Sequence, residues 1–266
     1  MTGLDGAVAV VTGAGSGIGR GIAGALHARG AHVVVADLDE AAATVAAAQV
    51  DGLAVATDVT DPDAVRTMVD RALDRHGRID VLVNNAGIGP QAPIADMTPD
   101  DWRFLLDVNL WGVLHGVSAV LPLLLAQGSG HIVNVASMSA LAPMPPLGGY
   151  AVTKAGVAAL TEVLEVELAG TGVHTSLVLP GPTRTGIGES LRHRTAEGGL
   201  REFRNEPPTE LWRTPEQVGA QVADAIRDQV PLVITHPELW DRVAARHARI
   251  AAAFGHVVPP TPPVTS

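Results

Sequence analysis

The chain contains no cysteine among its 266 residues. Disulfide bonds, iron–sulfur clusters and zinc sites with thiolate ligands are therefore excluded. The absence of disulfides is compatible with a reducing compartment, and we expect a cytoplasmic protein. A chain of this length can bury its apolar surface without help from cross-links or metals.

Basic residues are also scarce, with 18 Lys and Arg against 28 Asp and Glu and a formal net charge of −10. Nucleic-acid binding needs a basic face, so we expect no nucleic-acid partner. The 10 histidines form no pair with a carboxylate at the helical spacing typical of metal sites. We therefore also expect no metal.

Long hydrophobic runs are missing as well. The longest, residues 110–126, contains His115, Ser118 and Pro122 and falls short of the ~20 apolar residues that a membrane span needs. It predicts a buried helix, and we expect no membrane association. Residues 1–5 show neither the basic nor the apolar region of a signal peptide.

The sequence does contain a regular alternation of short β-branched runs and alanine-rich helical stretches. Strands are predicted over residues 7–12, 32–37, 53–56, 81–84, 131–136, 174–179 and 232–234. Helices are predicted over residues 17–29, 39–49, 62–76, 98–125, 150–168 and 215–228. Apolar strands separated by helices indicate a parallel sheet covered on both faces. We expect a single-domain α/β fold over residues 1–256, a Rossmann-like doubly wound parallel sheet of about seven strands.

Two segments depart from this regularity. Residues 182–213 combine glycines, prolines and many charges with weak patterning, which is typical of a substrate lid. Residues 257–266 are rich in proline and predict an extended or frayed tail.

A glycine-rich turn follows the first predicted strand, with glycine at positions 13, 15, 17 and 19. Glycine allows positive φ and close backbone approach, and the start of the following helix favours a pyrophosphate. The alternative is a tight turn that only packs the helix on the strand. The literal G-x-G-x-x-G match at positions 19, 21 and 24 lies inside the predicted helix, and we interpret it as accidental.

Asp37 ends the second predicted strand, where a carboxylate would accept hydrogen bonds from an adenosine ribose. A 2′-phosphate there would meet like charge, and neither Ser16 nor residues 38–40 supply a basic side chain to offset it. The pattern therefore favours NAD over NADP. The alternative is a solvated carboxylate at a strand end.

Tyr150, the only tyrosine of the chain, precedes Lys154 by four residues, which places both on one face of a predicted helix. For tyrosine to act as a base near neutrality, its pKa must fall from about 10 to about 7, a change of roughly 4 kcal/mol. A lysine ammonium and a positive nicotinamide ring both act in that direction. Ser137 could hold the substrate oxygen while Tyr150 moves the proton and hydride transfer proceeds.

Together these motifs resemble the short-chain dehydrogenase/reductase family, in its single-domain, NAD-preferring branch, over residues 6 to about 234. The resemblance implies interconversion of a secondary alcohol and a ketone with NAD, and assembly into a homotetramer or homodimer through the helices that bear Asn109 and Tyr150. It implies that Asn109 anchors a water chain to Lys154 and that Thr185 binds the nicotinamide carboxamide.

The site residues form three groups. The expected catalytic residues are Asn109, Ser137, Tyr150 and Lys154. The expected cofactor-binding residues are Gly13, Ser16, Gly17, Ile18, Gly19, Asp37, Leu38, Asp58, Val59, Asn85, Ala86, Gly87, Tyr150, Lys154, Pro180, Gly181, Thr183 and Thr185. The expected substrate-binding residues are Ser137, Met144, Leu147 and Tyr150.

The expected pocket walls, residues 88–91 and 140–147, are largely apolar and predict an alicyclic, terpenoid or steroid-like alcohol as substrate. The Gly148-Gly149 pair predicts a flexible wall beside Tyr150, and Ser139 fits the family spacing less well than Ser137. Three alternatives stay open: a catalytically silent dinucleotide-sensing or scaffold protein, an NADP-dependent ketone reductase, and epimerisation or dehydration through a bound nicotinamide.

Overall fold

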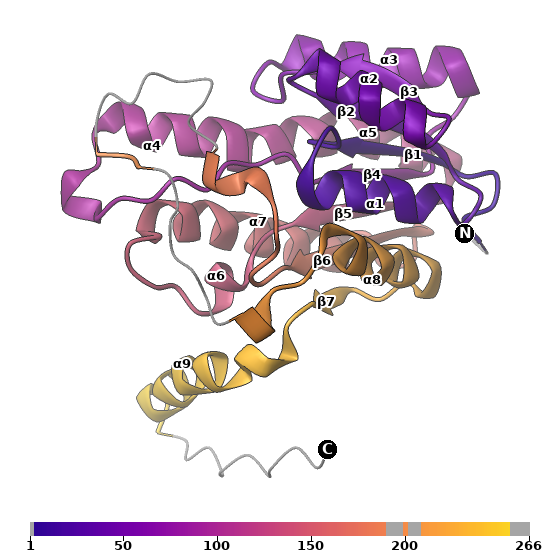
Figure 1. Cartoon of the computed structure of the whole chain (residues 1–266). Helices are drawn as coiled ribbons and strands as arrows, with labels where there is room; N and C mark the ends of the chain where they lie inside the picture. Colours follow the sequence, from indigo (N-terminus) through magenta and orange to yellow (C-terminus); the bar gives the residue numbers. More distant parts are fainter. Residues whose placement is uncertain (1–2, 190–198, 202–208, 256–266) are drawn as a thin grey trace.

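The computed structural model describes residues 3–189, 199–201 and 209–255. Seven strands form one parallel sheet in the order β3–β2–β1–β4–β5–β6–β7 (Figure 1). The strands are β1 (Val8–Thr12), β2 (His32–Asp37), β3 (Leu53–Ala56), β4 (Val81–Asn84), β5 (Gly130–Val135), β6 (Val173–Leu179) and β7 (Leu232–Ile234). All seven lie within one residue of the bounds that the sequence predicts, so the expected doubly wound parallel sheet is confirmed.

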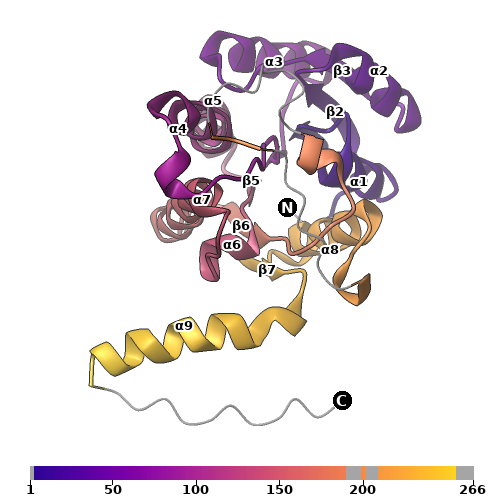
Figure 2. The same ribbon diagram turned by 60° about the vertical axis from the view of Figure 1, so that its left-hand side comes forward.

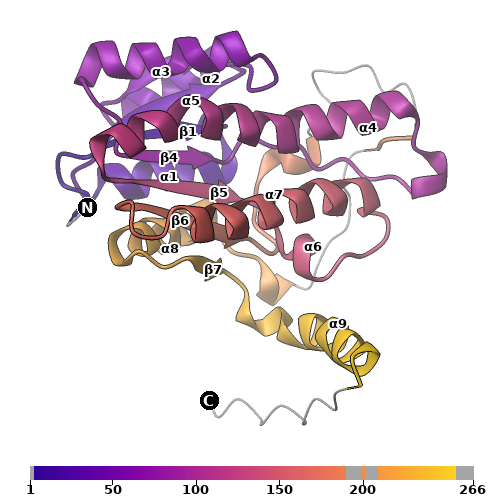
Figure 3. The ribbon, with the colours of Figure 1, turned by 180° about the vertical axis from the view of Figure 1, so that it is seen from behind.

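Helices cover both faces of this sheet. They are α1 (Gly17–His27), α2 (Glu40–Gln49), α3 (Pro62–His76), α4 (Pro99–Leu106), α5 (Gly112–Gln127), α6 (Met138–Leu141), α7 (Gly148–Glu167), α8 (Pro215–Asp228) and α9 (Trp240–Ala253). Helices α1, α2 and α8 pack on the face seen in Figure 1, and α3, α5 and α7 on the face seen in Figure 3.

The two cores follow from the pleat of the strands. In β1, Val10 belongs to the core under α3, α5 and α7, whereas Ala9 and Val11 belong to the core under α1, α2 and α8. Successive side chains of a strand point to opposite faces, so a continuous apolar run fills both. The strand order reverses between β1 and β4, and the carboxyl ends of these strands form the switch point of the sheet.

The predicted helix over residues 98–125 is confirmed as one continuous helical stretch, Pro99–Gln127, but a π-helical turn interrupts its regular periodicity. Thr98 and Asp101 form a capping box at the start of α4, and a π-helical turn at Asp107–Trp111 separates α4 from α5. The π turn adds a residue to the helix and shifts its periodicity, which an apolar pattern does not reveal. Within that turn Asn109 is fully buried.

The run Pro99–Gln127 is, within the described residues, one helical stretch long and apolar enough to cross a membrane by length and composition. In the fold, Val113, Val120 and Leu124 of α5 are buried in the core against the sheet. Packing on the sheet therefore accounts for the buried face of α5, whereas Trp111 and Leu125 on the same helical stretch remain exposed.

Helices α6 and α9 were not predicted. Figures 1 and 2 show α9 projecting away from the body of the molecule. It rests on the core through Val243, while Trp240, Ile250 and Phe254 remain exposed. The predicted tail at residues 257–266 and half of the predicted lid, residues 190–198 and 202–208, lie outside the described residues.

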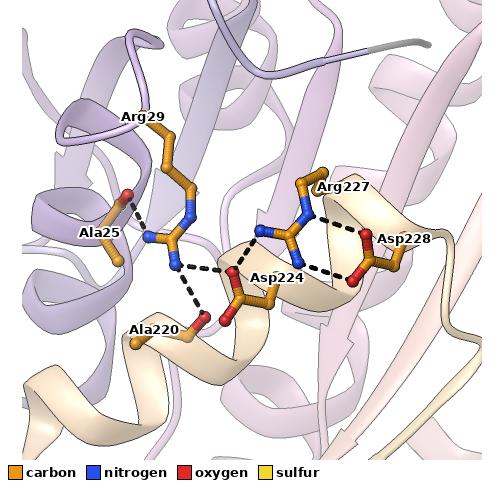
Figure 4. Close-up of polar contacts among 6 residues, drawn as sticks. All are labelled: Ala25, Arg29, Ala220, Asp224, Arg227 and Asp228. Atoms are coloured by element: carbon orange, nitrogen blue, oxygen red, sulfur yellow. Dashed lines mark hydrogen bonds and ion pairs between the residues drawn. The ribbon is translucent and has the colours of Figure 1, made fainter.

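Helices α1 and α8 cross at close range. Arg29 follows α1 and donates to the Ala25 carbonyl at 2.9 Å and to Asp224 of α8 at 2.7 Å, and Asp224 also pairs with Arg227 (Figure 4). These side chains are partly exposed, so each ion pair contributes little by itself. The closeness comes from glycine, because a Cβ added at Gly219 would overlap the backbone of Gly21.

We expect Gly219→Ala to lower the free energy of unfolding by about 2 kcal/mol or more, since the methyl group must push α8 away from α1. Urea denaturation measures this change. Gly24→Ala is the matched control, because a Cβ at Gly24 meets open space. The control should stabilise the protein by about 0.5–1 kcal/mol, and equal effects of the two variants would contradict the packing argument.

Candidate active site

Hydrogen bonds join the glycine turn after β1 to the residues just after β4, the neighbouring strand across the switch point. The Thr12 hydroxyl accepts hydrogen bonds from the backbone N–H groups of Asn85 at 3.0 Å and Ala86 at 3.1 Å. The Asn85 side-chain amide donates back to the carbonyls of Thr12 at 2.9 Å and Gly13 at 3.2 Å. Gly13 has φ +63°, and a Cβ there would lie 2.8 Å from Ala86 Cα. Only glycine combines this conformation with this approach.

The turn leads directly into the N-terminus of α1. Ser16 is the N-cap residue, and no acidic side chain lies in the first turn of the helix. The helix dipole at this end therefore favours an anion such as a pyrophosphate. Ile18 is half-buried behind the turn, and a Cβ added at Gly19 would overlap the Gly13 carbonyl. The helix thus starts as close to the turn as the backbone permits.

The Asp37 carboxylate is bound to the glycine turn rather than only to solvent. It accepts a hydrogen bond from Gly15 N–H at 2.8 Å and another from Asp39 N–H at 3.0 Å. A carboxylate has about four acceptor positions, so capacity for a ribose hydroxyl remains. The neighbouring Leu38 side chain is exposed.

Asp58 and Val59 follow β3 and make mainly local contacts. One oxygen of Asp58 accepts hydrogen bonds from both the N–H and the hydroxyl of Thr60, at 2.9 and 2.7 Å. Val59 is buried, and its carbonyl lies 2.9 Å from His115 Nδ1 of α5. These contacts order the loop after β3, and the cofactor contact expected of Asp58 and Val59 remains a prediction.

Tyr150 and Lys154 lie on the first turns of α7, as their spacing predicts. The Tyr150 side chain is half-buried and forms a hydrogen bond with the Ser137 side chain. Lys154 is buried, its Nζ donates to the Val135 carbonyl at 2.9 Å and lies 5.7 Å from the centroid of the Tyr150 ring. Ser137, placed by the end of β5, also accepts from Ser139 N–H and begins α6. The predicted trio is therefore gathered in one place.

The predicted catalytic trio adjoins the switch point through Gly87. A Cβ added at Gly87 would lie 3.3 Å from Lys154 Nζ and 3.2 Å from Asn109 Oδ1. Gly87 follows Ala86, which touches the glycine turn at Gly13. The predicted catalytic and cofactor-binding groups thus meet at one edge of the sheet.

The Asn109 amide joins this edge to α7. Its oxygen accepts from Ile88 N–H at 2.8 Å, and its nitrogen donates to the Ile88 carbonyl at 2.9 Å and to the Thr153 hydroxyl at 3.1 Å. Thr153 in turn donates to the Tyr150 carbonyl at 2.8 Å. Sequence reasoning missed Thr153, whose part depends on a partner more than 40 positions away in the chain.

Burial sets the ionisation of the two central groups. Loss of water raises the pKa of Tyr150 above its ordinary value, and the hydrogen bond from Ser137 acts in the opposite direction. Burial lowers the pKa of Lys154 to about 8, so the ammonium form still predominates at pH 7. The protein's own groups therefore leave Tyr150 protonated near neutrality.

The segment after β6 lies against both the glycine turn and the trio. The Pro180 carbonyl accepts from Met138 N–H, next to Ser137, at 2.9 Å. Thr183 is buried and donates to the Gly181 carbonyl at 3.1 Å. A Cβ added at Gly17 would lie 3.2 Å from Thr185 Cβ, so Thr185 stands over the glycine turn.

The expected substrate wall is only partly as predicted. Leu147 is buried at the start of α7, and Met144 is half-buried with its sulfur 3.5 Å from an Arg242 nitrogen of α9. Ile187 was missed: a Cβ added at Gly89 would lie 3.0 Å from Ile187 and 3.9 Å from the Tyr150 ring. Ile187 adds an apolar side chain to the surroundings of the phenol.

The predicted flexibility of the Gly148-Gly149 pair is wrong. Both residues belong to the first turn of α7. A Cβ added at Gly148 would lie 2.7 Å from Ile94, and one at Gly149 would lie 2.6 Å from Met97. The glycines are needed for tight packing of α7 against the loop before α4, and this wall is closely packed.

Comparison with known proteins agrees with this geometry. The family model of the short chain dehydrogenases matches residues 7–196. The chain belongs to the short-chain dehydrogenase/reductase family. This short-chain dehydrogenase is similar to an uncharacterized oxidoreductase of Listeria innocua, 34% identical over 230 residues that cover 82% of this chain and 90% of the relative. It is also similar to one of Staphylococcus epidermidis, 41% identical over 184 residues that cover 68% and 80%.

Two solved structures share the fold of this short-chain dehydrogenase. A short chain dehydrogenase/reductase from Burkholderia phymatum, in complex with NAD, is 32% identical with a TM-score of 0.85, over 100% of both chains. A 3-ketoacyl-(acyl-carrier-protein) reductase from Brucella melitensis, complexed with NADH, is 30% identical with a TM-score of 0.78, over 87% of this chain and 97% of that one. This short-chain dehydrogenase is therefore an oxidoreductase by family.

Because Tyr150 is the only tyrosine, the absorbance of tyrosinate reports its ionisation directly. We expect a titration midpoint above the ordinary tyrosine value of about 10. Ser137→Ala should move the midpoint further upward, because the hydrogen bond that stabilises the phenolate is lost. Ser139→Ala is the control and should match the wild type. Circular dichroism would show whether the Ser137→Ala variant is folded. A midpoint that is unchanged in the folded variant would contradict the hydrogen bond from Ser137 to the phenolate.

Proposed function

We propose that this protein is an NAD-dependent oxidoreductase that interconverts a secondary alcohol and a ketone, with Tyr150 as the acid/base. The observation that carries the proposal is the Tyr150 phenol, hydrogen-bonded to Ser137 and lying 5.7 Å, ring centroid to Nζ, from Lys154. A half-buried phenol between a hydroxyl and an ammonium is suited to exchanging one proton with a substrate oxygen.

The residues at the switch point fit a dinucleotide. The N-terminus of α1 favours the pyrophosphate, and Asp37, held by Gly15 N–H, stands where a ribose hydroxyl would donate. The negative charge of Asp37 disfavours a 2′-phosphate, which supports NAD over NADP. When bound, NAD⁺ supplies the hydride acceptor and a positively charged ring.

In oxidation, Tyr150 Oη takes the proton of the substrate hydroxyl while the Ser137 hydroxyl holds the same oxygen. In reduction, Tyr150 donates that proton to the ketone oxygen. The raised pKa of Tyr150 in the protein by itself favours the donor form, and positive charge beside the ring, from Lys154 and the cofactor, favours the base form. Whether Tyr150 is poised to donate or to accept the proton thus depends on how these charges balance burial.

The proposed substrate is an apolar alcohol of the alicyclic, terpenoid or steroid-like class. Ile187 supplies apolar surface near the phenol, and Leu147 and Met144 are the apolar side chains that the sequence predicts for the same wall. Apolar walls with a few polar groups at the reacting atom are the usual construction of a site that selects by shape.

The test is a screen of cyclic and aliphatic secondary alcohols with NAD⁺ and NADP⁺ in parallel, read as reduced-nicotinamide absorbance. We expect turnover with NAD⁺ and a loss of about 10²- to 10⁴-fold in kcat for Tyr150→Phe, with NAD⁺ binding retained. Turnover undiminished in Tyr150→Phe would contradict the acid/base role.

The same screen separates the alternatives. NAD⁺ binding without turnover of any alcohol or ketone would favour a dinucleotide-sensing protein, and preference for NADP(H) would favour the ketone reductase. A strong preference for sugars or charged acids would overturn the substrate class.

We also propose a homotetramer or homodimer, built through the long helices that bear Asn109 and Tyr150. Exposed apolar side chains on these helices support the proposal: Trp111 on the π turn, Leu125 on α5, and Val152, Val163 and Val166 on α7. Burying such side chains against a second copy would remove them from water.

Light scattering should therefore give a mass of four or two times the 27.4 kDa of one chain. Val166→Glu, at a position 76% exposed on α7, should shift the mass towards the monomer. Val45→Glu, at a position 59% exposed on α2, is the control and should leave the assembly intact. A monomeric wild type would refute the proposal.

A further inference from the structure

His236, two residues after β7, is fully buried and bonds to two separate segments, one at Gly181 and Pro182 and the other at Leu211. Its Nδ1 lies 3.0 Å from Gly181 N, and its Nε2 lies 3.0 Å from the Pro182 carbonyl and 2.8 Å from the Leu211 carbonyl. These contacts join segments 25 to 55 positions away from His236, and the family motifs do not account for them.

The partners determine the protonation of the ring. Gly181 N–H can only donate, so Nδ1 must be the acceptor, and the two carbonyls can only accept, so Nε2 must carry the proton. The Thr235 hydroxyl lies 2.6 Å from the same Nδ1. Burial lowers the pKa of His236, which agrees with a neutral ring. The neutral tautomer with its proton on Nε2 agrees with these contacts, and Gly181 N–H is shared between Nδ1 and the Thr235 hydroxyl oxygen, which lies 3.2 Å from it.

The ring also supports Gly181 from one side. A Cβ added at Gly181 would lie 2.6 Å from the ring carbon Cγ, so the backbone of this residue rests on the imidazole. Gly181 belongs to the segment that begins at Pro180, whose carbonyl binds Met138 N–H beside Ser137. The same segment reaches Thr185 over the glycine turn.

The Nε2 contacts lie where residues 182–184 and residues 211–213 bond to each other, beside this segment. Arg213 N–H donates to the Pro182 carbonyl at 3.0 Å, and Arg184 N–H donates to the Arg213 carbonyl at 3.0 Å. His236 adds Leu211 to the same junction. The His236 side chain thus bonds to both of these stretches, at Pro182 and at Leu211, and to Gly181, which precedes the first of them.

We propose that His236 is a positioning residue for the cofactor: it holds the Gly181 backbone so that the Pro180–Thr185 segment presents its groups to the nicotinamide. This inference rests on the proposed dinucleotide function of the site. His236 itself does not touch the reacting atoms, and its effect passes through the backbone of Gly181.

Two conservative substitutions test the contacts of Nδ1 and the contacts of Nε2 separately. In His236→Asn the amide stands near the position of Nδ1 and can still accept from Gly181 N–H. In His236→Gln the amide stands near the position of Nε2 and can still donate to the Pro182 and Leu211 carbonyls. His131→Gln is the control, because His131 is equally buried and bonds Ser176 within the sheet.

The readouts are the Kd for NAD⁺, the split between KM for NAD⁺ and kcat, and amide exchange of the peptides containing Gly181 and Arg213 in protein without added nucleotide. We expect His236→Gln to raise the Kd and KM for NAD⁺ about 5- to 10-fold, the worth of one hydrogen bond, and to speed exchange at Gly181. His236→Asn should keep the Kd within about 2-fold while exchange at Arg213 becomes faster. His131→Gln should lower stability and leave the Kd unchanged.

Equal Kd values for NAD⁺ in the wild type and both His236 variants, with unchanged exchange at Gly181, would overturn this inference alone. Equal losses in His236→Gln, His236→Asn and His131→Gln would also overturn it, because they would reflect general destabilisation. A wild type that binds no NAD⁺ would overturn the proposed function and this inference together, and that result is visible before any variant is made.

Discussion

The hydrogen bonds between Thr12 and the Asn85–Ala86 backbone are the contact on which the rest of the site depends. They join the ends of β1 and β4, where the order of the strands reverses. On one side of this junction the glycine turn starts α1, and on the other Gly87 reaches Lys154 and Asn109. This link fixes the position of the α1 N-terminus, which favours a pyrophosphate, relative to α7, which carries Tyr150.

Burial and nearby positive charge act in opposite directions on the pKa of the phenol, which governs the chemistry of the site. Burial raises the pKa of Tyr150 and lowers that of Lys154, so the protein alone separates two values that are ordinarily close together and leaves the phenol as the weaker acid. The Ser137 hydrogen bond limits the rise for the phenol. A positive ligand placed beside the ring would favour the phenolate, so under the proposed function the cofactor that receives the hydride would also lower the pKa of Tyr150.

The fold could be predicted from the sequence because its signals are local. Each apolar strand and each cap, such as Asp61 before α3 and Thr214 before α8, acts within a few residues. The π turn around Asn109 and the packing of Gly148 and Gly149 could not be predicted in this way. Both depend on partners distant in the chain, Ile88 for the asparagine and Ile94 and Met97 for the glycines.

The sequence by itself determined the sheet, the glycine turn and the identity of the residues at the site, because periodicity and residue chemistry are written in short stretches of chain. Only the tertiary structure decided that Asp37 binds back to Gly15, that Thr153 links Asn109 to Tyr150, and that one neutral histidine holds the segment after β6. Hydrogen bonds act over about 3 Å and require defined directions. Which donors and acceptors meet is therefore settled only when distant segments are packed together.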